Sequence, residues 1–131
     1  MANPETRLAK RILDALNGKD GVVVWKIHGS VYQEAGISDI LGCAFGVFLS
    51  LEVKLPRTRS RAEPSKIQEH QLRRVKRAGG VGFVITSVQE ALDIVSEIRE
   101  ALSSAGDLAS FAPSSLLIDS IDPTQIMETV Q

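Results

Sequence analysis

The sequence predicts an α/β protein with a mixed central sheet flanked by helices, in the element order αβββαβα. Three observations support this class. Three segments space their apolar residues three and four positions apart, as amphipathic helices do. Four short segments are apolar and mostly rich in β-branched residues, as strands are. A chain of 131 residues, 44% hydrophobic and 24% charged, is long enough to bury a core of its own.

Each predicted helix has a recognisable start. Asn3 is a suitable N-cap, followed by proline at the first helical position, and Ser65 and Ser87 are suitable N-caps for the other two helices. Glycine follows the first two helices, where it commonly ends a helix. The predicted helices span residues 3–17, 65–78 and 87–102.

The predicted strands span residues 22–27, 37–43, 45–54 and 81–86. The second and third strands are separated by a short turn through residues 44–46, which predicts a hairpin. Trp25 and Cys43 are both expected to pack in the core, Trp25 as a large aromatic side chain and Cys43 as a small apolar one.

Three charged residues interrupt the apolar stretch 36–56. Side chains alternate along a strand, so Glu52 and Lys54 point to the same side of the sheet. Asp39 lies on the preceding strand, and twelve residues separate it from Glu52. A hairpin that turns at 44–46 would therefore bring the two carboxylates into one region. One interpretation is a structural ion pair of Asp39 and Glu52 with Lys54.

The other interpretation is a metal site. Two neighbouring carboxylates raise each other's pKa unless a cation neutralises them. Mg²⁺ prefers one or two carboxylates with retained waters, and the backbone carbonyl of Val53 could be a further ligand. Lys54 cannot bind the metal, but its ammonium could orient a water molecule or stabilise charge on a phosphate. The spacing of Asp39 and Glu52 does not by itself choose between the two interpretations.

Two more polar residues face inward in this prediction. Gln68 falls on the apolar stripe of the helix 65–78, where it needs a hydrogen-bond partner such as the Lys54 amine or a water on the metal. A solvated Gln68 is the alternative. Glu5 lies one turn before Leu8 on the first helix, so it could reach the metal site or simply favour the helix N-terminus.

Charge is divided unevenly along the chain. Residues 54–77 carry nine lysines and arginines against two glutamates, and residues 90–131 carry eight acidic residues against one arginine. The basic block suits a polyanion such as a nucleic acid, because each neutralised phosphate releases counterions. A solvated basic loop and helix face would have the same composition.

Taken together, these residues resemble a known superfamily. The pattern Gly36-Ile37-Ser38-Asp39, then Glu52-Val53-Lys54, then Gln68 before Gly79-Gly80 is similar to that of PD-(D/E)XK nucleases, and most similar to their VRR-NUC type. Glu5 would match an acidic residue on the family's first helix. Ser38 replaces a proline of the family pattern and removes no ligand. The resemblance extends from about residue 5 to about residue 95.

The resemblance implies a restriction-endonuclease-like core and hydrolysis of DNA phosphodiesters with Mg²⁺ or Mn²⁺ as cofactor. Its site would consist of Asp39, Glu52, Lys54, Gln68 and Glu5, with Asp39, Glu52 and the Val53 carbonyl on the metal. It also implies a homodimer that cuts branched DNA, such as a Holliday junction. The residues expected to contact DNA are Arg57, Arg59, Arg61, Lys66, Arg73, Arg74, Arg77, His28, Ser30 and Tyr32.

Other functions stay open at this point. An exonuclease or a restriction enzyme of the same fold would use the same residues, and a non-catalytic nucleic-acid-binding module would need none of them. The nuclease domain is expected to span residues 1–104, followed by an acidic extension over 105–131. A single cysteine, no signal-peptide pattern and no apolar run of membrane-spanning length predict a cytoplasmic protein without membrane contact, in a bacterial host if a phage encodes it.

Overall fold

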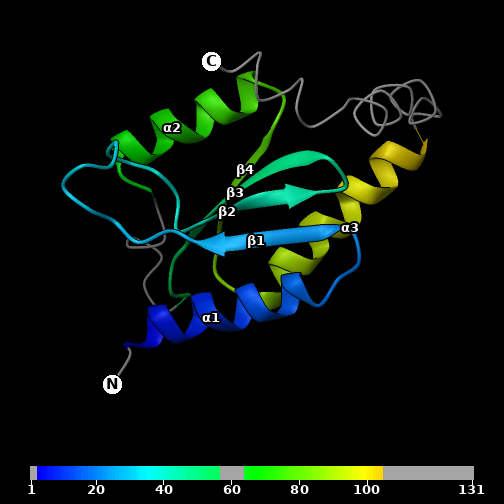
Figure 1. The fold of residues 1–131 in the computed structure, drawn as a ribbon, viewed down its shortest axis with the longest axis horizontal. Coiled ribbons are helices and arrows are strands. Elements are labelled where there is room, and N and C mark those ends of the chain that lie inside the picture. The colour runs from blue at the N-terminus through cyan, green and yellow to red at the C-terminus, as the bar shows by residue number, and fades with distance from the viewer. Residues whose placement is uncertain (1–2, 57–63, 105–131) are drawn as a thin grey trace, which may run out of the picture. The chain divides into compact units, whose positions relative to one another are not determined.

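The predicted order αβββαβα is confirmed. In the computed structural model, which describes residues 3–56 and 64–104, three helices flank a four-stranded mixed sheet (Figure 1). The elements are α1 (Pro4–Asn17), β1 (Val22–Lys26), β2 (Ile40–Ala44), β3 (Val47–Val53), α2 (Lys66–Arg77), β4 (Val81–Ile85) and α3 (Val88–Ser104). The predicted helix caps also form, since Asn3, Ser65 and Ser87 each accept a hydrogen bond from a backbone amide of the first turn.

The sheet follows the chain in the order β1-β2-β3-β4. The first three strands are antiparallel, and β4 runs parallel to β3 after the crossover through α2. The predicted hairpin turn is present between β2 and β3, where Phe45 and Gly46 both have positive φ angles (52° and 84°). A two-residue turn with this backbone matches the twist of the two strands.

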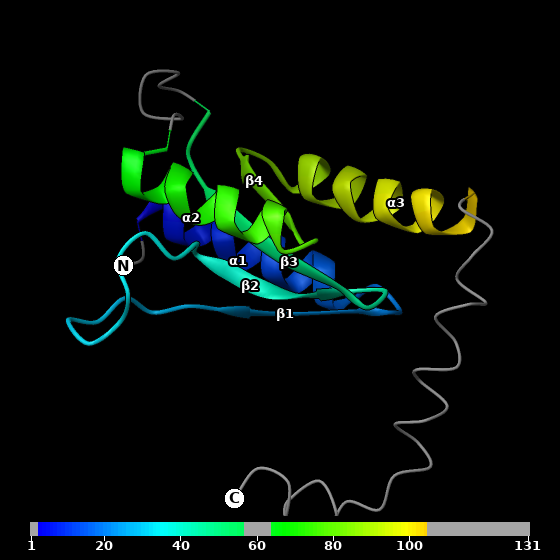
Figure 2. The same cartoon turned by 90° about the horizontal axis from the view of Figure 1, so that it is seen from above.

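The central strand β3 is covered on both faces of the sheet. Its last five residues, Leu49 to Val53, are all buried. Leu49, Leu51 and Val53 share the face on which α1 packs with Leu8, Ile12 and Leu16. Ser50 and Glu52 point to the opposite face, where α2 lies over β3 and β4 (Figure 2). Glu52 is therefore enclosed between the sheet and α2.

Two glycines permit the close packing of α2. A Cβ at Gly82 of β4 would lie 3.0 Å from the Leu72 side chain of α2. Gly36, in the loop before β2, has a φ of 84°, and a Cβ there would lie 2.7 Å from the backbone oxygen of Ile67. This backbone conformation favours glycine, and the contact leaves no room for a side chain. Gly36 thus lets the loop that precedes Asp39 run directly beneath α2.

Three sequence-based expectations are wrong. Trp25 is 59% exposed, and Cys43 is only half-buried, because α2 leaves the β1–β2 half of its sheet face uncovered. Val23 is exposed on the same uncovered half, and Phe48, near the start of β3, is exposed beside Cys43. The second strand begins at Ile40 rather than at residue 37, so Asp39 lies immediately before β2 and not within it. Residues 36–39 instead form part of the loop that α2 covers.

The structure divides into two units, Met1–Ile98 and Arg99–Gln131, and the four strands all belong to the first. Of the second unit, only the end of α3 over residues 99–104 is described. The predicted acidic extension 105–131 lies outside the described residues, so its boundary stays a prediction. Within 3–56 and 64–104, no helix is long and apolar enough to cross a membrane.

Candidate functional site

Glu52 is the centre of the site. It is only 3% exposed, at the penultimate position of β3 and beneath α2. Its Oε1 accepts a hydrogen bond of 2.9 Å from Nε2 of Gln68. Its Oε2 is buried and has no hydrogen-bond partner in the part of the chain that the structure describes. A buried carboxylate oxygen without a partner is costly, and proteins retain such groups mainly where they bind something or react.

The environment of Glu52 disfavours its charged form. Burial raises the pKa of the Glu52 carboxyl from 4.5 to about 8, and the negative charges of Asp39 and Glu5 act in the same direction. The positive charge of Lys54 opposes them but does not restore the ordinary value. At neutral pH and without a metal the Glu52 carboxyl is therefore mostly protonated, and a cation bound beside it would favour its charged form.

Asp39 reaches this site from the residue before β2. Its Oδ2 accepts a hydrogen bond of 2.8 Å from the backbone amide of Val53, and its Oδ1 lies 3.5 Å from the Lys26 ammonium. The carboxylate is thus held against the end of β3, one residue from Glu52 along that strand. Lys26, at the end of β1, was not singled out from the sequence, because only the register of β1 on β2 brings it to Asp39.

Lys54 and Glu5 complete the group of charges. Nζ of Lys54 lies 3.7 Å from Oε1 of Glu52, and the Lys54 side chain is largely buried. Lys54 follows β3 and is held by its backbone amide, which donates to the oxygen of Ile85. Glu5 lies in the first turn of α1, half-buried, and its charge acts on Glu52. The β2–β3 hairpin and the first turns of α1 and α2 therefore bring the five predicted site residues together, namely Asp39, Glu52, Lys54, Glu5 and Gln68.

Gln68 is positioned by the start of α2. Its Oε1 accepts a hydrogen bond of 2.9 Å from the backbone amide of Ser65. The Ser65 hydroxyl in turn accepts a hydrogen bond from the backbone amide of Gln68, and the two bonds form a capping box. This arrangement leaves Nε2 of Gln68 free to donate to Glu52. The predicted partner, the Lys54 amine or a water on a metal, is replaced by the carboxylate itself. The Ser-x-x-Gln spacing in the sequence was the signal that could have indicated this orientation.

Behind the charged residues lies a polar layer that the sequence did not reveal. Ser50 and Ser38, both buried, share a hydrogen bond of 2.7 Å between their hydroxyl groups. Gln71, and not Gln68, is the most buried polar residue of α2, and its Nε2 donates to the backbone oxygen of Ala35. These bonds tie the loop before Asp39 to β3 and α2. Ser38, which departs from the family pattern, thus has a structural partner here.

The residues predicted to contact DNA are dispersed over exposed positions. Lys66, Arg73 and Arg77 are exposed on α2. Arg74 is also exposed, but its guanidinium already binds Glu34, at 3.0 Å, and Oε1 of Gln71. His28, Ser30 and Tyr32 are exposed in the loop between β1 and β2. Arg57, Arg59 and Arg61 lie outside the described residues.

The geometry of this site suits a hard cation with few protein ligands. Among the described residues, no group of three or more histidine, cysteine, aspartate or glutamate side chains is arranged to hold a metal ion. Glu52, beside Asp39, nevertheless has a carboxylate oxygen without a partner among the described residues and a raised pKa. Mg²⁺ needs only one or two carboxylates because it retains several waters. The donor set therefore fits Mg²⁺ or Mn²⁺ better than a cation that requires a complete protein cage.

Comparison with known structures supports this type of fold. The chain is similar to a solved structure of a VRR_NUC domain, with a TM-score of 0.57 and 25% sequence identity. The similarity covers 72% of this chain and 97% of that one. No protein-family model matches the sequence, and no curated protein matches it either. The α/β core is thus consistent with that of a VRR_NUC domain.

Proposed function

We propose that this chain is a divalent-metal-dependent nuclease of the VRR-NUC type within the PD-(D/E)XK superfamily, hydrolysing DNA phosphodiesters. The observation that carries the proposal is the buried Glu52 carboxylate, whose Oε2 has no partner within residues 3–56 and 64–104 and whose pKa is raised to about 8 beside Asp39 and Lys54. The similarity to a VRR_NUC domain supports the same conclusion.

Asp39 and Glu52 would hold the metal, with the Val53 carbonyl as a further ligand. When bound, Mg²⁺ or Mn²⁺ supplies positive charge for the phosphate oxygens and lowers the pKa of a bound water. The chain keeps Asp39 ready for this role through the Val53 amide, which fixes one carboxylate oxygen. The raised pKa means that a cation would displace a proton from Glu52 and so remove the cost of ionising it.

The remaining residues of the site position the reacting groups. The Lys54 ammonium, beside Glu52, can hold the attacking water and stabilise negative charge on the phosphate. Gln68 fixes the orientation of the Glu52 carboxylate through its hydrogen bond. Glu5 increases the negative potential at Glu52 and so favours a cation there. The exposed cations of α2, with His28, Ser30 and Tyr32, would contact the sugar–phosphate backbone without reading sequence.

The proposed substrate is branched DNA, with a Holliday junction as the preferred form. Both the nuclease activity and the preference for branched DNA can be tested in one experiment. The protein is incubated with labelled four-way junction, flap, single-stranded and linear duplex DNA, in Mg²⁺, Mn²⁺ or EDTA. We expect cleavage at internal positions near the branch, in the presence of either metal and not in EDTA. Release of mononucleotides from the ends would instead indicate an exonuclease. Binding without cleavage of any substrate in either metal would contradict the nuclease proposal.

We also propose that the protein acts as a homodimer, which would place two sites across a two-fold axis on a symmetric junction. The exposed apolar residues Val23 and Trp25 of β1 and Phe48 of β3 lie on one face of the sheet, with Cys43 between Val23 and Phe48. Contiguous apolar surface of this kind, containing aromatic residues, is typical of protein interfaces. A second copy of the chain is the occupant that we propose for it.

Trp25→Glu is expected to convert the dimer to a monomer, because it places a charge in an apolar contact. Sedimentation velocity over a range of micromolar concentrations measures the change, with Ile67→Glu, an exposed apolar residue of α2, as the matched control. A wild-type protein that sediments as a monomer, or a Trp25→Glu dimer, would contradict this placement of the interface.

A further inference from the structure

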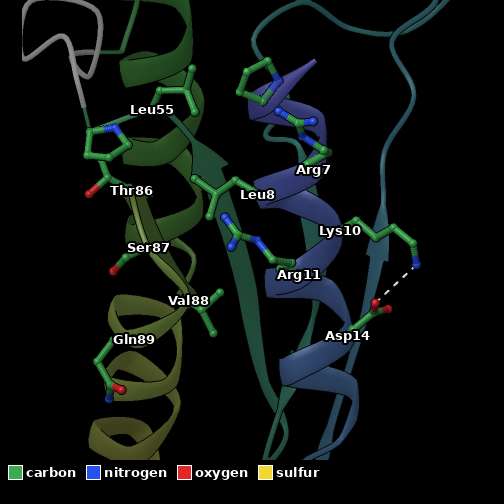
Figure 3. A pocket seen from close by; sticks show the side chains of 12 residues that line it. Arg7, Leu8, Lys10, Arg11, Asp14, Leu55, Thr86, Ser87, Val88 and Gln89 are labelled. Carbon is green, nitrogen blue, oxygen red and sulfur yellow. Dashed lines mark hydrogen bonds and ion pairs between the residues drawn. The ribbon is translucent and has the colours of Figure 1, made fainter. Parts of the chain in front are cut away.

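A groove lies between α1 and the start of α3, on the face of the sheet away from α2. Its volume is about 940 Å³, and Figure 3 shows its lining side chains. Arg11 extends from α1 toward the side on which α3 lies, while Lys10 and Asp14 pair on the side away from α3. The lining residues are Pro4, Arg7, Leu8, Lys10, Arg11, Asp14, Leu55, Pro56, Thr86, Ser87, Val88 and Gln89.

The groove carries unbalanced positive charge. Neither guanidinium, of Arg7 or of Arg11, has an ion-pair or hydrogen-bond partner in the part of the chain that the structure describes. The one acid in the lining, Asp14, lies 3.2 Å from Lys10. Two acids on the neighbouring α3 keep their negative charge, but their side chains bind neutral partners, Glu90 with Thr86 and Asp93 with Gln89, and neither is paired with an arginine of the groove. The two arginines are therefore available to an anion.

Two lining residues of the groove are chain neighbours of residues in the candidate site. Pro4 directly precedes Glu5, which acts on Glu52, and Leu55 directly follows Lys54. The two ends of the protein backbone that frame the site thus continue into the walls of the groove. These shared segments place one end of the groove near the candidate site.

We propose that this groove binds the sugar–phosphate backbone of one strand of the DNA substrate beyond the phosphodiester that is cleaved, with Arg7 and Arg11 on successive phosphates. The inference rests on the proposed nuclease function. It adds a second DNA-contact surface, distinct from the exposed cations Lys66, Arg73, Arg74 and Arg77 of α2. Arg7 and Arg11 are DNA-positioning residues and take no part in the reaction.

The spacing of the two arginines supports a nucleic-acid strand over a compact anion. Four residues of an α-helix advance about 6 Å along its axis, a step comparable to that between neighbouring phosphates of one strand. Arginine binds phosphate through paired hydrogen bonds, which suits repeated contacts along a backbone. The apolar part of the lining, Leu8, Leu55 and Val88, offers surface to the sugars.

The double variant Arg7→Ala/Arg11→Ala tests the groove by fluorescence anisotropy with a labelled four-way junction in Ca²⁺. We expect the dissociation constant to rise about tenfold, and the slope of log affinity against log salt to become less steep by roughly 1.8, for two lost phosphate contacts. Lys19→Glu is the matched control, because it changes net charge by the same amount at an exposed position outside the groove. An unchanged affinity and salt slope, or the same effect from Lys19→Glu, would overturn the proposal.

A second measurement separates the groove from the catalytic site. Bis(p-nitrophenyl) phosphate is too short to reach both arginines, so its Mn²⁺-dependent hydrolysis by the double variant should stay within about twofold of wild type, a difference worth less than 0.5 kcal/mol. The KM for junction DNA should rise while kcat is preserved. Loss of hydrolysis of the small ester would overturn the positioning role. Absence of any hydrolysis by the wild-type protein would instead count against the nuclease function and leave the binding result standing.

Discussion

Replacing Glu52 with alanine is expected to abolish DNA cleavage, by about 10³-fold or more, while junction binding changes little. The variant removes one of the two carboxylates proposed to hold the metal, and the expected loss corresponds to about 4 kcal/mol of transition-state stabilisation. Asp39→Ala and Lys54→Ala should have similar effects. DNA binding is retained because the phosphate contacts come from other, mainly basic, residues. Single-turnover cleavage with excess enzyme in Mg²⁺, alongside anisotropy in Ca²⁺, measures the two properties separately.

Ser50→Ala is the matched control for this experiment. Ser50 lies two residues before Glu52 on the same face of β3 and is equally buried, but its hydroxyl binds Ser38 and neither carboxylate. Ser50→Ala should retain most of the cleavage activity. This result would show that disturbing β3 is not enough to abolish cleavage. Cleavage by Glu52→Ala at the wild-type rate in Mg²⁺ would rule out the proposed mechanism.

Replacing Glu52 with glutamine is expected to stabilise the metal-free protein at neutral and alkaline pH. The folded-state pKa of about 8 lies above the ordinary 4.5, so the folded protein retains a proton that the unfolded chain loses. The contribution of Glu52 to stability is therefore complete below about pH 4.5 and is lost as the pH rises toward 8. Glutamine does not titrate, and it can still accept the hydrogen bond from Gln68.

The difference in unfolding free energy between Glu52→Gln and wild type should thus grow between pH 5 and pH 8, to about 3 kcal/mol. A difference of this size raises Tm by roughly 10 °C in a domain of this length. Thermal and urea unfolding in EDTA at several pH values measure it. Glu97→Gln, at an exposed position of α3, is the control and should show no such trend.

Added Mg²⁺ provides an internal check on the same pair of proteins. A cation bound by Asp39 and Glu52 stabilises the wild-type fold and should do so much less in Glu52→Gln, which narrows the gap in Tm. A gap that is independent of both pH and Mg²⁺ would show that Glu52 is not the titrating cation-binding group.

Local signals were sufficient for the elements of this fold. The caps Asn3, Ser65 and Ser87 and the turn at Phe45-Gly46 are encoded by neighbouring residues, and all were predictable. The alternation of side chains along β3 also predicted that Glu52 and Lys54 lie on one side of the sheet. The distance of 3.7 Å between Lys54 Nζ and Glu52 Oε1 agrees with this. The roles assigned to these side chains remain proposals that the experiments above test.

Burial was harder to predict, because it depends on which elements cover a surface. The sequence of β1 is as apolar as that of a core strand, yet Trp25 is exposed because α2 packs against β3 and β4 and leaves β1 uncovered on this face. Gln71 shows the converse. It reads as an ordinary polar helix residue but is buried, because the loop at Ala35 passes beneath α2 and accepts its hydrogen bond.

The amino-acid sequence by itself determined the element order, the helix ends, the hairpin turn and the set of charged residues from which a site could form. These features depend on interactions within a few residues of each other. Only the tertiary structure decided that Asp39 is held by the Val53 amide, that Gln68 donates to Glu52, and that Oε2 of Glu52 is enclosed without a partner within the described chain. The physical reason is that desolvation and hydrogen bonding at a buried carboxylate depend on every element packed around it, and these elements come from separate parts of the chain.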